Sequence, residues 1–443
     1  MLKTFANAWK LPDLRRKLIF TFIIIVLYRI GCVLPVPFID PGAIEDWFNT
    51  ETSGTMLQYL NILSGSAFSQ ATLFALSVSP YITSSIVIQL LTIAIPALER
   101  LSKNGEEGKK KITQITRITT VGIALITSYG YYMTLKSSAV NAISDPNWFK
   151  ATVIISCHCA GAALIMWLAE KINESGIGNG ISMILFANII AALPTMVTGF
   201  VSTLKLSSET TFKSVTQTIL IYALFLAIAV LIVAFVVFMT ESERKIPVQY
   251  AKRVVGRKMY GGQSTHLPIK LNMSGVMPII FASSILMLPA TIAMFFPDPE
   301  EGTFWAGFLG LFSTTNIFYV LIELVLIIAF SYFYLAISFN PVEVANNLKK
   351  NGGFIPGLRP GKPTSDFISS SLKKITLIGA FFLAVIAVLP MFINIISSLV
   401  GGVNLGSVSF GGTSMLIVVG VVLETVRDLE SQITMRHYKG FLG

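Results

Sequence analysis

Long apolar runs recur along the whole chain and limit what it can fold into. A transmembrane helix needs about 20 mostly apolar residues, because a rise of about 1.5 Å per residue must cross about 30 Å of hydrocarbon. Ten runs meet this requirement: 18–34, 73–95, 115–135, 151–168, 180–201, 219–239, 276–296, 317–339, 375–396 and 410–426. The sequence therefore predicts an all-α polytopic membrane protein with ten transmembrane helices.

The composition argues against the soluble classes of protein. Of the 443 residues, 53% are hydrophobic and only 13% are charged, whereas soluble domains carry about 25% charged residues. So few polar side chains cannot cover the surface of a cytosolic enzyme, and so many apolar ones exclude a disordered chain. No nucleotide-binding loop, catalytic triad or metal-binding motif appears. We therefore expect no cofactor.

The basic residues are distributed unevenly between the connections that join the predicted spans. The net charge is +10, and 27 of the 33 Lys and Arg residues fall on one side of the predicted membrane, against four on the other. This asymmetry is the positive-inside pattern, and it places both termini in the cytoplasm. If one span were missing or added, every later connection would be assigned to the opposite side of the membrane and the asymmetry would be lost. The asymmetry therefore independently supports ten spans.

Two of the predicted cytoplasmic connections, residues 240–275 and 340–374, are long and basic. The first carries Lys252, Arg253, Arg257 and Lys258 between tyrosines. This mixture suits contact with RNA, with an acidic protein or with anionic lipid, or these charges serve only to fix the topology. In the second, the Gly and Pro residues of 352–361 predict a defined turn that presents Arg359.

Residues 51–70, on the opposite side, contain an apolar segment at 56–63 that is too short to span a membrane. Gly65 and Ser66 interrupt it before the second span. A plug or a vestibule lining inside the protein, and an interfacial helix on the outer leaflet, are the alternatives.

Charge inside the predicted spans is scarce. Arg29 and Glu323 are the main examples, and both lie close enough to a span end to reach the interface. Ion-coupled transporters usually place ionisable groups near the middle of the bilayer. His158 lies between Cys157 and Cys159, but successive helix positions point in different directions, so these three do not converge on a metal.

Several ordered motifs of this chain resemble those of the SecY family, the channel subunits of the bacterial Sec translocon. They occupy residues 79–91, 167–182, 250–253, 263–268, 339–341, 346–350, 357–361 and 410–414, so the resemblance covers nearly the whole chain. One departure is Ser77, where the family usually has glycine, and the C-terminal tail is short. The resemblance identifies the chain as a member of this family.

The resemblance implies two inverted five-helix halves, residues 1–202 and 203–443, around a central pore. It places a re-entrant plug within about 51–70. It also places a lateral gate, with spans two and three on one side and spans seven and eight on the other. By motif position, the ring that lines the pore is Val78, Ile82, Ile184, Ile280 and Ile417. Gln89 and Thr92 lie at the gate and Asn188 near the pore, where they either tune closure or pack between helices. A ring of β-branched side chains excludes ions by dewetting.

The implied function is a protein-conducting channel, not an enzyme, that moves unfolded secretory polypeptides across the bacterial inner membrane and inserts transmembrane segments sideways. The implied partners are SecE and SecG within SecYEG, the SecA ATPase, the ribosome, signal peptides and nascent chains, and anionic lipids. Lys252, Arg253, Arg257, Lys258 and Arg359 would dock the motor and the ribosome. A secondary transporter would explain ten spans but not the basic loops or the sparse charge within the spans, and a membrane-embedded enzyme lacks paired catalytic groups.

Overall fold

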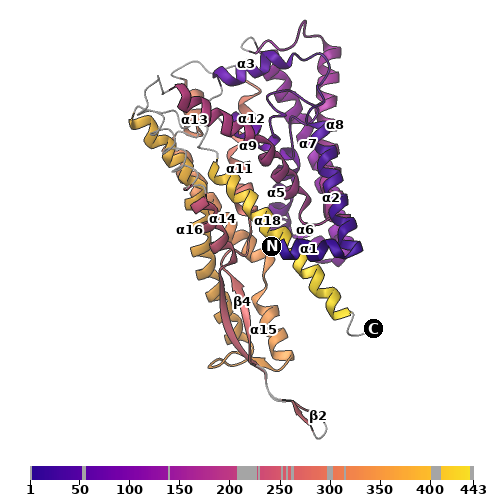
Figure 1. The fold of residues 1–443 in the computed structure, drawn as a ribbon, viewed down its shortest axis with the longest axis vertical. Coiled ribbons are helices and arrows are strands. Elements are labelled where there is room, and N and C mark those ends of the chain that lie inside the picture. Colours follow the sequence, from indigo (N-terminus) through magenta and orange to yellow (C-terminus); the bar gives the residue numbers. More distant parts are fainter. Residues whose placement is uncertain are drawn as a thin grey trace.

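The computed structural model describes residues 2–51, 56–137, 140–206, 227, 230–250, 253–255, 258–260, 264–296, 303–313, 316–400 and 411–439. Long helices lie side by side and form the body of the molecule (Figure 1). The helices before residue 207 are α1 (Leu2–Lys10), α2 (Pro12–Gly31), α3 (Pro41–Glu51), α4 (Met56–Ser64), α5 (Ser79–Ala94), α6 (Pro96–Lys103), α7 (Gly105–Lys136), α8 (Trp148–Ser175) and α9 (Gly180–Leu206).

The second half of the chain adds helices and five strands. Its labelled helices are α11 (Met277–Leu286), α12 (Leu288–Ala293), α13 (Phe304–Leu311), α14 (Ile317–Ser338), α15 (Pro341–Lys350), α16 (Lys362–Val400) and α18 (Gly411–Lys439). The strands are β1 (Glu243–Tyr250), β2 (Arg253–Val255), β3 (Lys258–Tyr260), β4 (Ser264–Lys270) and β5 (Gly353–Phe354).

The predicted spans are helical over most of their described length, apart from one to three residues at some ends, and two differences are larger. The second span begins at Ser79 and not at Leu73, because Ser77 has a positive φ of 51° and Pro80 suits only the first turn of a helix. The seventh is broken at Met287 between α11 and α12. Of the sixth span, the structure describes residue 227 and the helix Val230–Glu241.

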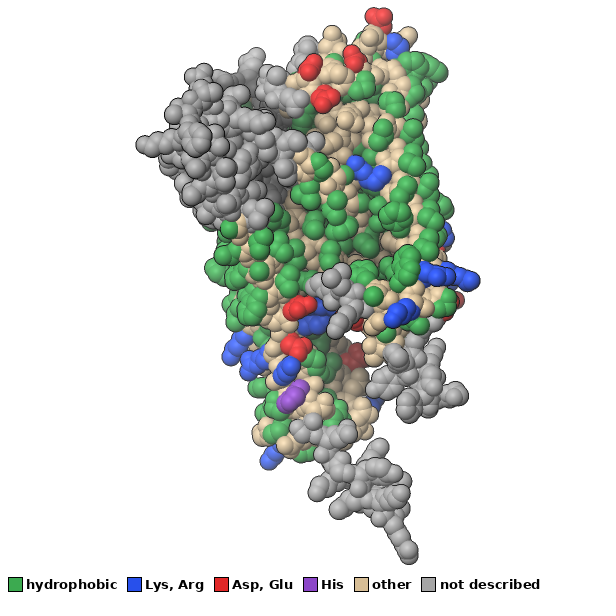
Figure 2. Space-filling model, in the orientation of Figure 1, with side chains coloured by type: hydrophobic (Ala, Val, Ile, Leu, Met, Phe, Trp, Pro, Cys, Tyr) green, Lys and Arg blue, Asp and Glu red, His purple; other side chains and the backbone are tan. Residues whose placement is uncertain are grey.

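Length and hydropathy mark several of these helices as membrane-spanning. Within the described residues, Trp148–Ser175, Ile317–Lys350 and Lys362–Leu389 are each long and apolar enough to cross a bilayer. Helices α5 and α6 meet the same criterion together, across a bend of 101°. Figure 2 shows hydrophobic side chains over the middle of the visible face, while most Lys and Arg side chains on it lie toward the end that carries the strands.

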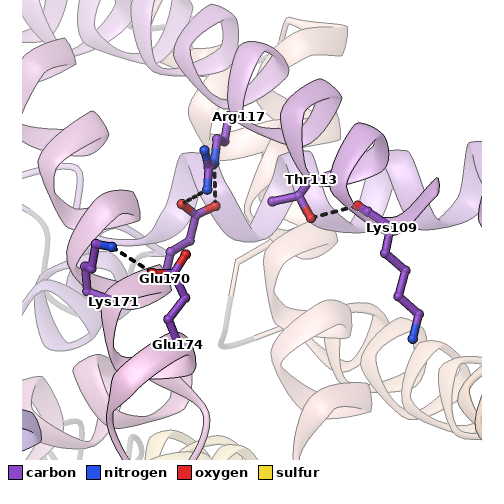
Figure 3. Close-up of polar contacts among 6 residues, drawn as sticks. All are labelled: Lys109, Thr113, Arg117, Glu170, Lys171 and Glu174. Atoms are coloured by element: carbon purple, nitrogen blue, oxygen red, sulfur yellow. Dashed lines mark hydrogen bonds and ion pairs between the residues drawn. The ribbon is translucent and has the colours of Figure 1, made fainter. Parts of the chain in front are cut away.

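A partly buried ion pair joins two of the long helices. Helix α7 packs against both α5 and α8. Arg117 of α7 meets Glu170 of α8 through two contacts, Nε to Oε1 at 2.9 Å and Nη2 to Oε2 at 2.8 Å (Figure 3). The carboxyl side chain is only 11% exposed, so the two-point geometry of the guanidinium offsets the cost of burying it.

The two basic connections form one unit, which the sequence did not predict. Strand β1 pairs antiparallel with β4 over seven residues and also with β5, where Gln249 lies opposite Phe354. Alternate residues of β1, Ile246 and Val248, are buried against Ile368 and Leu372 of α16, as expected of a strand with one covered face. These connections therefore contain an ordered sheet, which joins residues 243–270 to residues 353–354.

Candidate functional site

The five residues assigned to the pore ring come together in one buried cluster. Val78 precedes α5 and Ile82 lies in it, while Ile184, Ile280 and Ile417 come from α9, α11 and α18. Each of the five is between 0% and 4% exposed. Four separate helices therefore contribute β-branched side chains to this cluster, and such side chains have few rotamers to lose when they pack.

Helix α4 lies against this cluster inside the protein. Leu63 packs on the same cluster, and Ile62 is buried beside Ala192 of α9 and Met287. Ser64, at the end of α4, is only 1% exposed. An interfacial helix would leave one face to lipid headgroups along its length. The burial of α4 against α9 therefore favours the re-entrant alternative for residues 56–64, whereas residues 52–55 lie outside the described part.

Asn188 connects α4 to two other segments. It lies one turn after Ile184 in α9, and its amide nitrogen donates to the hydroxyl of Tyr28 at 2.8 Å and to the carbonyl of Leu63 at 2.6 Å. Nη1 of Arg29 approaches Asn188 Oδ1 at 3.4 Å. The Arg29 side chain thus points toward Asn188 and the end of α4.

One hydrogen bond crosses the predicted lateral gate. Gln89 of α5 donates to Ser85 at 3.1 Å and accepts from the hydroxyl of Tyr334 in α14 at 3.3 Å. Thr92 instead donates to the carbonyl of Ile88 in its own helix, at 2.7 Å. Tyr334 was not predicted from the sequence, although a tyrosine in a largely apolar helix is a signal that its hydroxyl has a hydrogen-bond partner.

The predicted docking residues fall into two groups. Arg359 is exposed in the turn between β5 and α16, between Gly357 and Gly361, whose φ values of 83° and 111° favour glycine. Its carbonyl accepts from Thr364 at 2.8 Å, which fixes the turn.

Two of the other four docking residues belong to the short hairpin of β2 and β3. The backbones of Arg253 and Lys258 belong to β2 and β3, whereas Lys252 and Arg257 lie outside the described residues. Figure 1 shows this hairpin at the far tip of the unit that carries the strands.

A cavity of about 470 Å³ borders the pore cluster on the side of the strands. Ile279 and Leu416 of that cluster line it, and so do the charged residues Lys270, Glu424 and Arg427. Burial, reinforced by the nearby positive charge of Arg427, lowers the pKa of Lys270 at the end of β4. The cavity is thus lined by both apolar and charged side chains.

The remaining buried ionisable residues have separate surroundings. His158 is buried, with Nδ1 at 2.9 Å from the carbonyl of Ile154 and its ring edge-on to Tyr131. Glu323 is buried in α14. Among the described residues, no three His, Cys, Asp or Glu side chains gather in a way that could hold a metal ion.

Comparison with known proteins identifies the family. The SecY family matches residues 72–426 of this chain. The protein translocase subunit SecY of Streptomyces scabiei is 42% identical, and that of Mycobacterium bovis 40% identical, each over the full length of both chains. The chain belongs to the SecY family.

Solved structures of channels share the fold. A structure described as that of a protein-conducting channel matches with a TM-score of 0.63 and 16% identity, over 94% of this chain and 92% of the other. The canine Sec61 in a ribosome–channel complex matches with a TM-score of 0.60 and 15% identity over the same shares. This member of the SecY family is accordingly a helical membrane protein with the fold of a protein-conducting channel, and it functions in protein translocation.

Proposed function

We propose that polypeptides cross this channel through the cluster of Val78, Ile82, Ile184, Ile280 and Ile417. The observation that carries the proposal is that residues from four helices meet there, beside a buried helix, α4, that is not part of any span. A ring of apolar side chains has no hydrogen-bonding preference for what passes, and it dewets when it is empty. Helix α4 then acts as the plug that completes the seal.

We further propose that the side opening lies where α5 and α7 meet α11, α12 and α14. Helix α5 packs against α11, and α7 against α12. The Gln89–Tyr334 hydrogen bond spans this contact. A helix with a charge at its centre costs about 2.5–3.5 kcal/mol to place in the bilayer, whereas apolar residues are favourable there. A segment exposed at this opening can therefore partition between channel and lipid according to its hydrophobicity.

The strand-bearing unit is our candidate for the cytosolic dock. Its basic residues and exposed turn suit the phosphates of ribosomal RNA and the acidic surface of a motor protein. The ribosome as partner is supported by the fold shared with a channel found in a ribosome complex. The other proposed partners are SecE, SecG, the SecA ATPase, signal peptides, nascent chains and anionic lipids.

The proposed location is the bacterial inner membrane, with both termini in the cytoplasm. The two proposed halves of the channel are residues 1–202 and 203–443.

The channel accounts for features that the competing classes leave unexplained. A small-solute transporter has no use for a dock built from two basic loops, and its ionisable groups normally line the substrate path. An enzyme requires groups positioned for catalysis. We infer that this chain is not itself an enzyme, and that its energy comes from the motor, the ribosome or the proton-motive force.

Photo-crosslinking tests the proposed path directly. A photoreactive amino acid at Ile82 or Ile184, in a complex shown to be translocating, should capture a stalled secretory chain, because both side chains lie in the apolar cluster. The same probe at Ile118, which faces away from the cluster with 75% exposure, is the control and should not capture it. Absence of capture at both cluster positions would contradict the proposal.

A further inference from the structure

The last turn of α4 is held by side chains from other parts of the chain. The Leu63 carbonyl accepts hydrogen bonds from the amide of Asn188 at 2.6 Å and from the hydroxyl of Ser77 at 3.1 Å. The last four carbonyls of a helix have no partner within the helix and need one elsewhere. Helix α9 and the segment before α5 therefore supply what α4 lacks at this end.

These contacts belong to a small buried network. Besides Leu63, the Asn188 amide donates to the hydroxyl of Tyr28 at 2.8 Å, and it lies 3.3 Å from the hydroxyl of Ser77. Tyr28, Asn188 and Ser77 are 0%, 0% and 5% exposed. A buried polar group that loses its partner keeps the full cost of desolvation. Asn188, Tyr28 and Ser77 contact one another without α4, but Asn188 and Ser77 both bond the Leu63 carbonyl only while α4 is docked, so the network favours the docked position.

Ser77 occupies a backbone conformation that favours glycine. Its φ is 51°, in the left-handed region where a side chain is strained and glycine is not. Despite that strain, this position carries a hydroxyl, and the hydroxyl contacts both Leu63 and Asn188. Ala71 also has a positive φ, of 42°, so it is the pair of contacts made by the Ser77 hydroxyl, and not the strain alone, that points to a role for this side chain.

The network lies between the pore cluster and a bend in the chain. Ser77 immediately precedes Val78, and Asn188 follows Ile184 by one helical turn. On the other side of Leu63, Gly65 and Ser66 have positive φ values of 63° and 70°, which turn the chain sharply.

Beyond this bend the chain has an anchor outside α4, because the carbonyl of Phe68 accepts from the Tyr131 hydroxyl at 2.7 Å. The bend is also bonded to α4, since the amides of Phe68 and Ser69 donate to the side chains of Ser64 and Asn61 at 3.0 Å each. Displacement of α4 from the cluster must therefore break these contacts or carry residues 65–69 with it.

We propose that Tyr28, Ser77 and Asn188 form a latch that positions α4 against the pore ring in the closed channel and that breaks when the channel opens. The inference rests on the proposed function, since a latch is meaningful only if α4 is the plug. It assigns Ser77 and Asn188 as positioning residues for the seal. A polypeptide that enters the ring pushes on Leu63 and separates its carbonyl from both donors.

Replacement of Ser77 by glycine tests the latch without harming the fold. Ser77→Gly removes the hydroxyl and relieves the strained φ, so the melting temperature of the purified complex should not fall. The resting ion conductance of the complex in planar bilayers should rise about fivefold, which is the effect of one lost hydrogen bond on a closed–open equilibrium. Asn188→Ala should raise the conductance as well. In the double variant, the shift of the closed–open equilibrium, expressed as a free energy, should be smaller than the sum of the shifts in the two single variants, because the two residues share Leu63 as a partner.

Ser128→Ala is the matched control. Ser128 is equally buried, but its hydroxyl donates to Ala124 in its own helix, so its loss should leave conductance unchanged. Unchanged conductance in both Ser77→Gly and Asn188→Ala overturns the latch, and so does an equal rise in Ser128→Ala. Capture of a nascent chain at Ile82 in the same preparations separates the two claims: capture without a conductance change removes only the latch, whereas absence of capture removes the proposed path.

Discussion

At the scale of single residues, two buried carboxyl groups of this chain have opposite surroundings. Glu170 is 8% exposed and pairs with Arg117 through both of its oxygens. Glu323 is 1% exposed, and its Oε2 has no hydrogen-bond partner in the part of the chain that the structure describes. An unpaired buried carboxylate is costly, whereas a paired one becomes costly only when its partner is removed.

The same substitution at these two positions should therefore have different effects on stability. Glu170→Gln breaks the pair and should lower the stability of the purified complex by about 1 kcal/mol, a modest loss because Arg117 is partly exposed to solvent. Glu323→Gln keeps the shape and removes the ionisable group, so stability should be unchanged or higher. Thermal unfolding of both variants in one detergent makes the comparison. A larger loss for Glu323→Gln would reveal a partner of its carboxylate.

The residue scale also shows what the sequence could predict. The five residues proposed for the pore ring were chosen by motif position, and all five belong to one buried cluster; that they line a pore stays a prediction. The contacts of Asn188 could not be predicted, because Tyr28 lies 160 positions and Leu63 125 positions away from it along the chain. Which polar side chains meet is decided by the packing of α2, α4 and α9, and apolar periodicity does not encode it.

At the scale of helices and strands, apolar runs predicted the spans well and the irregular segments poorly. Residues 73–78 are apolar enough to be counted within a span, yet they form turns because the positive φ of Ser77 cannot continue into α5. Strand β1 was missed because its charged residues and Pro247 outweigh the alternation of Ile246 and Val248, and β4 was missed because Pro268 argues against a strand. The short apolar segment 56–63 was correctly predicted to be helical, and its burial follows from its contact with α9.

Deletion of residues 55–64 tests the role of α4 as an element. If α4 seals the ring, its loss should raise the resting ion conductance of the reconstituted complex, because the apolar ring alone must then hold back ions. Adding Ser77→Gly to the deletion should have no further effect, since Leu63 is absent. Conductance equal to that of the intact chain would instead assign α4 a structural role only.

At the scale of the whole molecule, a series of packed elements connects the strand-bearing unit to the predicted gate. Strand β5 pairs with β1, α15 packs on α16, and α16 packs along α14, the helix that carries Tyr334. The hydroxyl of Tyr332 in α14 also bonds the Lys373 carbonyl of α16 at 3.1 Å. A force applied to the turn at Arg359 therefore has a short packed route to the helix that faces Gln89.

Charge reversal at the Arg359 turn tests this arrangement. Arg359→Glu should abolish or strongly reduce translocation while the protein remains inserted, because the turn is held by a backbone contact to Thr364 that the substitution leaves intact. Lys350→Glu makes the same change of charge at another exposed position of the unit, and export should continue at close to the normal rate. Transport of a secretory protein into inverted membrane vesicles measures both variants. Normal transport with Arg359→Glu would remove this turn from the dock, and an equal loss with Lys350→Glu would show that the charge of the whole unit matters more than the turn itself.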